Sequence, residues 1–261
     1  MLKALTSTTR AQQKIESASP RTLAASSATI AVLQSNSLPA LVQRDLERMI
    51  VAGELPAGTK LNETALAQSL GVSRGPIREA FRALEESGLV RLTKNRGVFV
   101  RQVSVEEADE IYELRAILDE YAGRKAAQTA TRANIAELQA LVARMDDAAA
   151  RVDLDAYHRA NVEFHDLLVK LAGNAKLLQT YRRLVNELHL YRRATLAQEG
   201  ALPVSTREHH AIVERIAARQ SIQAGRALFE HAMGSRTRMH SVRSAPAAAL
   251  QAAAGSGRTK R

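Results

Sequence analysis

Three arginines spaced four residues apart are the first side chains in this sequence whose types and spacing predict chemistry. Arg74, Arg78 and Arg82 lie in a stretch where apolar residues recur at helical spacing, so the three side chains share one face of the expected helix. Guanidinium groups donate paired hydrogen bonds to phosphate oxygens, and a row of them suits a groove lined with phosphates. Because a solvated helix face has the same pattern, the neighbouring elements must decide between the two interpretations.

A second basic segment follows directly after this helix. Lys94 and Arg96 lie in the sequence TKNRG, residues 93–97, which has the composition of a hairpin turn. The flanking residues 89–92 and 98–100 favour β-strands. This segment predicts a β-wing with a positively charged tip.

The arginine helix is preceded by the elements of a helix-turn-helix. Asn62 is suited to cap a short helix that ends at Leu70, and Gly71 supplies the left-handed residue of a tight turn. Ser73 then caps the arginine helix, and Pro76 lies in its first turn, where the missing N–H costs little. Helix, turn, arginine helix and wing in this order predict a winged helix-turn-helix that binds double-stranded DNA.

A second group of side chains, in the C-terminal half, consists of residue types that bind metals. Asn161 and His165 are one helical turn apart and therefore share a face of a helix. His209 and His231 fall on two later helices and could converge with them inside a bundle, where such a set of donors suits a divalent transition metal.

Spacing alone leaves other interpretations of these histidines open. A single histidine on a helix is more often a hydrogen-bonded or surface residue than a metal ligand. His158 could compete for the same position, since it lies further back on the helix of His165. His210 points about 100° away from His209 by helix geometry, so the two are not expected to face one ion.

The composition indicates a helical protein with aliphatic cores. The chain has 261 residues, of which 46% are hydrophobic and only 3% aromatic. It contains no cysteine, which excludes disulfides and thiolate metal sites and is compatible with a reducing cytoplasm. No apolar run approaches the ~20 residues that cross a membrane, so no membrane partner is expected.

The net charge of +10 is unevenly distributed along the chain. Residues 1–36 carry four cations and one anion, and residues 241–261 carry four cations and no anion. Residues 37–101 carry ten cations and seven anions, whereas residues 102–240 carry nineteen of each. The composition of residues 1–36 also suits an organelle transit peptide, but we interpret both ends as disordered basic extensions that add weak phosphate contacts.

Residues 102–240 are predicted to be entirely helical. Ser104 and Glu107 have the spacing of a capping box. The helix that follows carries five apolar residues at helical spacing, which are Ile111, Leu114, Ile117, Leu118 and Tyr121. Breaks in the pattern then cut the remainder into about six helices, at residues 129–131, 151–153, 173–174, 200–203 and 219–220.

The expected fold is therefore mainly α. A winged helix-turn-helix of three helices and a small β-hairpin occupies residues 37–101, and an all-α antiparallel bundle of about six helices occupies residues 102–240.

The N-terminal part resembles a known family. The sequence blocks GELPAGTKL, LAQSLGVSR and PIREA resemble, in register, the winged helix of GntR-type bacterial transcription regulators, over about residues 38–101. The resemblance implies that Ser73, Arg74 and Arg78 contact bases or phosphates in the major groove of DNA. Gly75 stands where many members carry Thr, so one phosphate contact is in question there. The wing residues implied to lie along the minor groove are Lys94, Asn95, Arg96 and Gly97.

The C-terminal part resembles the ligand-sensing domain of the FadR subfamily, the type called FCD. The similar segments are IYELRAILDEYAGRKAA, NVEFHDLLVKLAGN, REHHAIVERI and ALFEHAM, and they span about residues 104–240. In metal-binding members an acidic or amide residue and three histidines hold a divalent ion, and these map to Asn161, His165, His209 and His231. The metal is expected to be Zn or Ni. Asn161 stands where Asp is common, so weaker metal binding is expected.

The resemblance also implies a small organic acid as effector. Three imidazoles and one amide leave coordination positions open, to which a carboxylate can bind. Arg115 would add a bidentate contact to the acid, or would instead form a salt bridge with Asp119. Arg192 and Arg193 lie on a later helix and are candidates for the same pocket, although at least one of them must face outward.

The sequence is compatible with three functions, which differ in how well they explain its motifs. The favoured one is a homodimeric repressor in the bacterial cytoplasm, bound to a two-fold operator on the nucleoid and released by its effector. A metal-dependent hydrolase is the second, but Glu163 lies about 200° around the helix from His165 and no His-Glu-x-x-His pattern is present. An architectural DNA-binding protein without effector is the third, and it would leave the polar cluster without a role.

Overall fold

The computed structural model describes residues 37–188, 191, 195, 196, 198 and 200–243. The chain divides into two compact units, one with the residues up to Leu46 and Glu63–Arg82, the other with Glu47–Asn62 and the residues from Ala83 onward. The expected basic extension at residues 1–36, and residues 244–261 of the C-terminal one, lie outside the described residues.

The first unit contains the helix-turn-helix. It comprises the start of α3 (Leu38–Val51), all of α4 (Glu63–Ser69) and most of α5 (Arg74–Glu86). Gly71 has a φ of +64°, the left-handed conformation that glycine adopts without strain, and it turns the chain from α4 into α5. Ile77, Ala80 and Phe81 are buried along one face of α5. The prediction of two helices joined by a glycine turn is confirmed.

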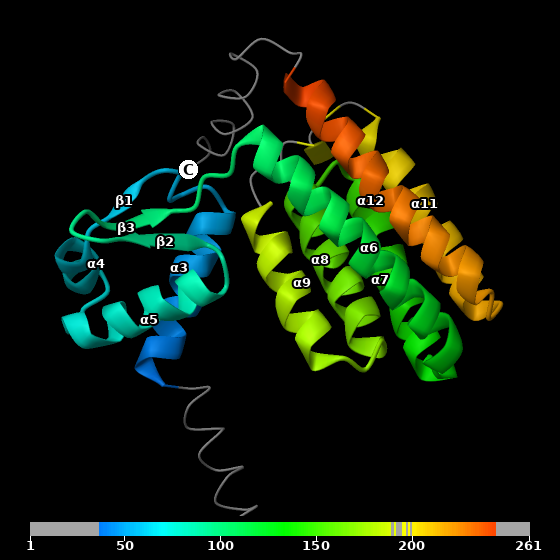
Figure 1. Cartoon of the computed structure of the whole chain (residues 1–261), viewed down its shortest axis with the longest axis horizontal. Coiled ribbons are helices and arrows are strands. Elements are labelled where there is room, and N and C mark those ends of the chain that lie inside the picture. Colours follow the sequence, from blue (N-terminus) through cyan, green and yellow to red (C-terminus); the bar gives the residue numbers. More distant parts are fainter. Residues whose placement is uncertain (1–36, 189–190, 192–194, 197, 199, 244–261) are drawn as a thin grey trace, which may run out of the picture. The chain divides into compact units, whose positions relative to one another are not determined.

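The second unit begins with a small antiparallel sheet. Its strands are β1 (Lys60–Leu61), β2 (Val90–Thr93) and β3 (Gly97–Val100), in the spatial order β1-β3-β2 (Figure 1). Thr93 pairs with Gly97, and Asn95 between them has a φ of +61°, which asparagine tolerates better than most residues. The predicted hairpin is confirmed, and β1, which has only two residues, is an addition to it.

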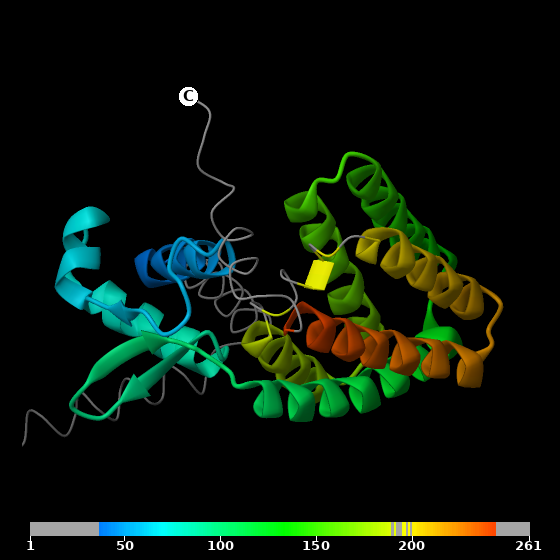
Figure 2. The ribbon, with the colours of Figure 1, turned by 90° about the horizontal axis from the view of Figure 1, so that it is seen from above.

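Six helices follow among the described residues (Figures 1 and 2). They are α6 (Val105–Thr129), α7 (Arg132–Ala150), α8 (Leu154–Leu171), α9 (Ala175–Glu187), α11 (Ala201–Ala217) and α12 (Ser221–Arg243). Four of the five predicted breaks fall at the junctions between helices, but the one at residues 200–203 is too long, because α11 begins at Ala201, directly after the left-handed Gly200, and includes Pro203 in its first turn. Polar residues cap four of the helix starts. Ser104 Oγ accepts a hydrogen bond from Glu107 N at 3.1 Å, and Thr131, Asp153 and Asn174 cap α7, α8 and α9 in the same way.

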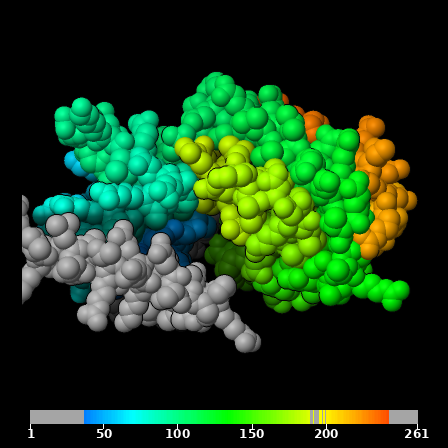
Figure 3. Space-filling view, turned by 60° about the horizontal axis from the view of Figure 1, so that its bottom comes forward, coloured from blue at the N-terminus to red at the C-terminus, as the bar shows by residue number. Residues whose placement is uncertain are grey.

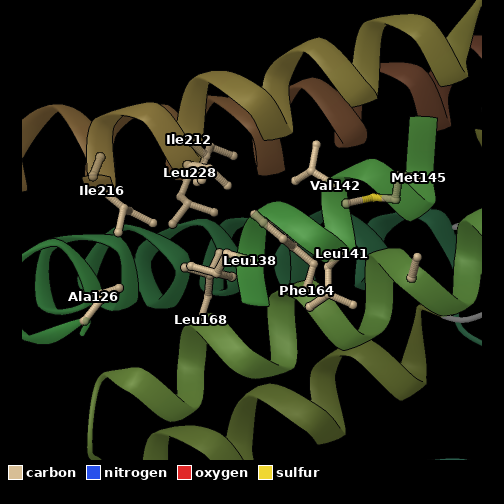
Figure 4. Close-up of a cluster of buried hydrophobic side chains, with 14 of the residues drawn as sticks. Ala126, Leu138, Leu141, Val142, Met145, Phe164, Leu168, Ile212, Ile216 and Leu228 are labelled. Atoms are coloured by element: carbon tan, nitrogen blue, oxygen red, sulfur yellow. The ribbon is translucent and has the colours of Figure 1, made fainter. Parts of the chain in front are cut away.

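The main core of the bundle is largely aliphatic, with two aromatic residues, Tyr157 and Phe164, among its members; Figure 4 shows Phe164 among the aliphatic side chains. Leu138 of α7, Phe164 of α8, Ile212 of α11 and Leu228 of α12 are fully buried and belong to one cluster. Helix α9, yellow-green in Figure 3, lies on the outside of the bundle and buries Leu177 and Tyr181 on its inner face. These helices hold the polar residues described below in a fixed packing.

Helix α6 buries a different face from the one that its apolar residues predicted. Ile111 is buried, but Leu114, Ile117 and Tyr121 are 54%, 58% and 42% exposed. The buried side of α6 instead carries small or polar residues, among them Ala116, Ala122 and Gly123. One reason is the close approach of α12 at Gly123, where even a Cβ would be crowded, although Tyr112 and Arg115 are buried nearer the start of the helix.

Helices α6 and α12 run antiparallel and lie side by side in Figures 1 and 2. Arg236 near the end of α12 pairs with Asp109 near the start of α6, and Gly225 near the start of α12 lies against Glu120. A Cβ at Gly123 would lie 2.6 Å from Leu228 Cδ1 and 2.9 Å from the carbonyl oxygen of Ala224. Glycine is therefore required at this helix crossing.

Replacing Gly123 by alanine should lower the free energy of unfolding by about 1–3 kcal/mol, because the added methyl group overlaps the backbone of α12. Gly234→Ala is a matched control in α12, since its Cβ would come no closer than 3.4 Å to Arg238 Nη1. Urea unfolding of both variants measures the difference. Equal stability of the two would contradict this account of the crossing.

Candidate functional site

The predicted arginine stripe is exposed. Arg74 and Arg78 have side chains that are 58% and 59% exposed, and Arg82 is exposed as well. All three lie on α5 away from its buried face, as the four-residue spacing predicted. The helix begins directly after Ser73, so Arg74 lies in its first turn.

Glu63, the first residue of α4, contacts two of these arginines. Its carboxylate accepts hydrogen bonds from Arg74 Nε at 2.5 Å and from Arg78 Nε at 2.9 Å. The pKa of the Glu63 carboxyl lies below its usual value, chiefly because of the hydrogen bond from Arg78. The sequence analysis missed this residue, because separations of 11 and 15 residues across a turn form no recognisable pattern. Its position as an acid at the start of the preceding helix was the only signal.

The tip of the wing is exposed over all four predicted residues, which are Lys94, Asn95, Arg96 and Gly97. The Arg96 guanidinium lies 5.9 Å from the centre of the Phe99 ring, a distance at which a cation is attracted to the ring face. The tip of the hairpin therefore presents two cations, Lys94 and Arg96, and the Phe99 ring orients the guanidinium of Arg96.

The structure brings the four predicted metal-binding residues together. Asn161 and His165 of α8, His209 of α11 and His231 of α12 are each at most 5% exposed. The ring centres of the three histidines lie 4.6 to 5.4 Å from one another, and one nitrogen of each ring lies within 4.8 Å of the others. The other two candidates are elsewhere: His158 is not part of this cluster, and His210 is exposed and pairs with Asp146 at 2.9 Å.

Two of the three rings have an oxygen acceptor within hydrogen-bond distance of Nδ1, and the third has a carboxylate further away. The carbonyl oxygen of Ser205 lies 2.6 Å from Nδ1 of His209, and Glu208 Oε2 lies 2.6 Å from Nδ1 of His231. Asp119 Oδ1 lies 3.8 Å from Nδ1 of His165. An acceptor at Nδ1 places the proton there and leaves Nε2 as the nitrogen that can bind a metal, as in the carboxylate–histidine pairs of metal sites.

The contact between Asn161 and His209 also fits a cation. Because a carbonyl can only accept, Nδ1 of His209 carries the proton, and Nε2 of the neutral ring is an acceptor. Asn161 Oδ1, another acceptor, lies 3.0 Å from this Nε2. A divalent ion bound by both atoms would remove their repulsion; the alternative is a turned amide that donates from Nδ2. Burial lowers the pKa of His231 below its ordinary value, although the contact with Glu208 acts the other way, and the lowered pKa favours the neutral form that binds metals.

A small cavity of about 20 Å³ adjoins this cluster. Its polar lining consists of Tyr112, Arg115, Asn161, Thr195, Ser205, His231, Ser235 and Arg238. Arg115 is fully buried, donates from Nε to Tyr181 Oη at 3.2 Å, and pairs with Asp119 at 3.1 Å. The predicted salt bridge of Arg115 with Asp119 is confirmed, and Arg115 also lines the cavity, while its contact to an acid stays a prediction. Arg192 and Arg193 lie outside the described residues.

Arg238 and Glu208 belong to this site but were missed by the sequence analysis. Both nitrogens at the end of Arg238 lie 3.1 Å from Glu208 oxygens, a bidentate pair. Burial acts to raise the pKa of Glu208, but the hydrogen bonds from His231 and Arg238 outweigh it and lower the pKa. Their pairing joins α11 to α12, so the spacing of residues along either helix gave no signal for it.

Glu163, the candidate base of a hydrolase, does not belong to the cluster. Its side chain is 50% exposed and pairs with Arg144 at 2.6 Å. It therefore lies on the outer surface of α8, as the angle around the helix predicted.

A winged helix-turn-helix with exposed arginines, followed by a helical bundle, defines the class of DNA-binding transcription regulators. Comparisons with known proteins agree. Residues 40–100 match the bacterial regulatory proteins of the gntR family, and residues 110–233 match the FCD domain. The chain belongs to the GntR family of bacterial transcription regulators, with an FCD domain, and is not an enzyme.

Individual relatives show how far the similarity extends. The Nta operon transcriptional regulator of Aminobacter aminovorans is 35% identical over 144 residues, which are 55% of this chain and 68% of that protein. The transcriptional repressor RspR of Escherichia coli K12 is 26% identical over 73% of this chain and 83% of its own length. The solved structure of E. coli McbR/YncC has a TM-score of 0.70 at 22% identity, covering 78% of this chain and 98% of that one, and shares the fold. No helix among the described residues is long and apolar enough to cross a membrane.

Proposed function

We propose that this regulator is a repressor whose operator binding is changed by a small carboxylate bound at a metal site in the FCD domain. The observation that carries the proposal is the set of three buried histidines, two of them hydrogen-bonded at Nδ1 to an oxygen acceptor, next to a cavity lined by Arg115 and Arg238. Relatives named as repressors support the direction of the regulation. Assignment to the FadR subfamily, residence in the cytoplasm and association with the nucleoid are parts of the same proposal.

The DNA-binding half of the proposal assigns roles to the two exposed basic elements. Arg74 and Arg78, with Ser73 and Gly75 beside them, would contact the major groove, since a helix of this kind fits there. The wing residues Lys94 to Gly97 would follow the minor groove. Their exposure and charge support these roles.

Glu63→Gln should change sequence preference rather than abolish DNA binding. Removing the charge should raise the affinity for random-sequence DNA by about 0.2–1 kcal/mol, the usual worth of an exposed ion pair, since the arginines lose a competing anion. The affinity for operator DNA should rise less, because Arg74 and Arg78 lose the carboxylate that orients them. Fluorescence anisotropy with operator and random-sequence DNA measures the ratio of the two affinities. Glu79→Gln, an exposed acid on α5, is the control, and equal ratios for the two variants would refute the role.

The ligand-binding half assigns the metal to Asn161, His165, His209 and His231. A divalent ion held there would supply a positive charge to which a carboxylate binds. Arg115 and Arg238 would orient the acid, and the serine and threonine hydroxyls of the cavity would accept or donate its remaining hydrogen bonds. We include Arg192 and Arg193 as further candidates for the acid.

A homodimer is proposed because two-fold operators are read by two-fold proteins. The exposed apolar face of α6, formed by Leu114, Ile117 and Tyr121, supports this and offers a surface for a second copy of the chain. Ile117→Glu should therefore convert the dimer to a monomer in light scattering. Ile222→Glu, at a residue 67% exposed on α12, should leave it dimeric. A dimeric Ile117→Glu variant would place the interface elsewhere.

The whole proposal is tested by thermal unfolding with small mono- and dicarboxylates, with and without Zn²⁺ or Ni²⁺, followed by operator footprinting with the acids that stabilise the protein. We expect at least one acid to raise the melting temperature and to release the DNA. Protection of one asymmetric site, or DNA binding that no acid changes, would instead support an architectural DNA-binding protein.

A further inference from the structure

The charged side chains described around the cavity cancel one another. Arg115 pairs with Asp119 at 3.1 Å, and Arg238 pairs with Glu208 through two contacts of 3.1 Å. Both carboxylates face Nδ1 atoms of histidines, and neither is among the atoms that lie within 4.8 Å of one another in the cluster. Among the described residues, two positive and two negative charges therefore surround the site. The two carboxylates lie on the Nδ1 side of histidine rings and are not among the candidate metal donors.

The donors that would touch a metal ion are all uncharged. His165, His209 and His231 offer neutral nitrogens, and Asn161 offers an amide oxygen. A divalent ion in this set would keep its full charge of +2 in a site whose four donor residues are at most 5% exposed. Burying an uncompensated charge is costly, so these donors alone should hold an ion weakly.

We propose that metal and carboxylate bind to this site as a cooperative pair, with Asn161 as the residue that makes each depend on the other. The inference rests on the proposed metal site. The carboxylate supplies the negative charge that the donors lack, so it raises the affinity for the metal. By thermodynamic linkage the metal raises the affinity for the carboxylate by the same factor. The ligand class is an anionic carboxylate rather than a neutral molecule of similar shape.

The experiment measures Zn²⁺ affinity of the full chain by competition with a chromophoric chelator, in acetate or in acetamide, its neutral counterpart, at constant ionic strength. We expect acetate to raise the affinity by about 5- to 150-fold, the usual range of coupling between two ligands. Asn161→Asp supplies the missing charge from the protein. In acetamide this variant should bind Zn²⁺ more tightly than the unmodified chain does. Acetate should raise its Zn²⁺ affinity by a smaller factor.

Asn174→Asp is the matched control, because it makes the same chemical change at the cap of α9, where aspartate is an equally good cap. It should behave like the unmodified chain. Equal Zn²⁺ affinity of the unmodified chain in acetate and acetamide would overturn the cooperative pair while leaving the metal site intact. Failure of both the unmodified chain and Asn161→Asp to bind Zn²⁺ in either solution would overturn the metal site itself.

Discussion

Replacing Arg74 and Arg78 by alanine should weaken operator binding by about 1–3 kcal/mol for each arginine, the usual cost of losing a guanidinium that reads a base. The two side chains are more than half exposed on one face of α5 and are held in place by Glu63. Fluorescence anisotropy at several salt concentrations measures the loss. If an arginine contacts only a phosphate, its loss should weaken binding to all DNA sequences alike. It should also lower the number of counterions released on binding, read from the salt dependence of the affinity, by about one.

A double variant with the same change of charge separates these contacts from the overall field of the protein. Arg132 and Arg159 are exposed residues of α7 and α8 in the C-terminal bundle. Arg132→Ala with Arg159→Ala should leave operator affinity within a few-fold of the unmodified chain, because neither residue lies on the elements proposed to contact DNA and salt screens the remaining field of exposed charges. An equal loss in the two double variants would show that α5 is not the reading helix.

Replacing His165 and His209 by alanine should abolish bound metal and the response to the effector. Two of the three imidazoles disappear, and a site with one histidine and one amide cannot retain an ion through purification. For protein loaded with Zn²⁺ in acetate, metal content by mass spectrometry should be about one ion per unmodified chain and a trace in the variant. The stabilisation by added Zn²⁺, which is about 2.7 kcal/mol at 100 times the dissociation constant, should disappear as well.

His210→Ala is the control for this experiment. His210 is adjacent to His209 in the sequence, but it is exposed and pairs with Asp146. The control should retain metal and respond to the effector. Unchanged metal content in the variant without His165 and His209 would refute the assignment of the ligands.

The fold could be predicted from the sequence wherever local rules decide. Ser104 caps α6 and Gly71 makes the turn before α5, as their residue types predicted. The buried face of α6 could not be predicted, because apolar residues occur around much of this helix. Its burial is decided by Gly123 and by the distant Gly225, which allow α12 to approach.

The candidate site was predicted in part for a similar reason. The spacing of Asn161 and His165 fixes a shared helix face, but nothing in the spacing shows that His209 and His231 meet them. Whether these side chains lie close together depends on the packing of α8, α11 and α12. The resemblance to the FCD domain, and not the spacing, predicted that they do. The partners Glu63 and Arg238 act across elements, and side-chain pairs of that kind leave no local periodicity to read.

The small size of the cavity determines the order of events during binding. A space of about 20 Å³ holds roughly one water molecule, and even acetate is larger. We therefore expect the residues that line the cavity to rearrange as the proposed acid enters, so that entry and rearrangement are one event. The time needed for repression to end would then be set by how often these walls separate, and a mutation that loosens them would speed the response without touching the acid.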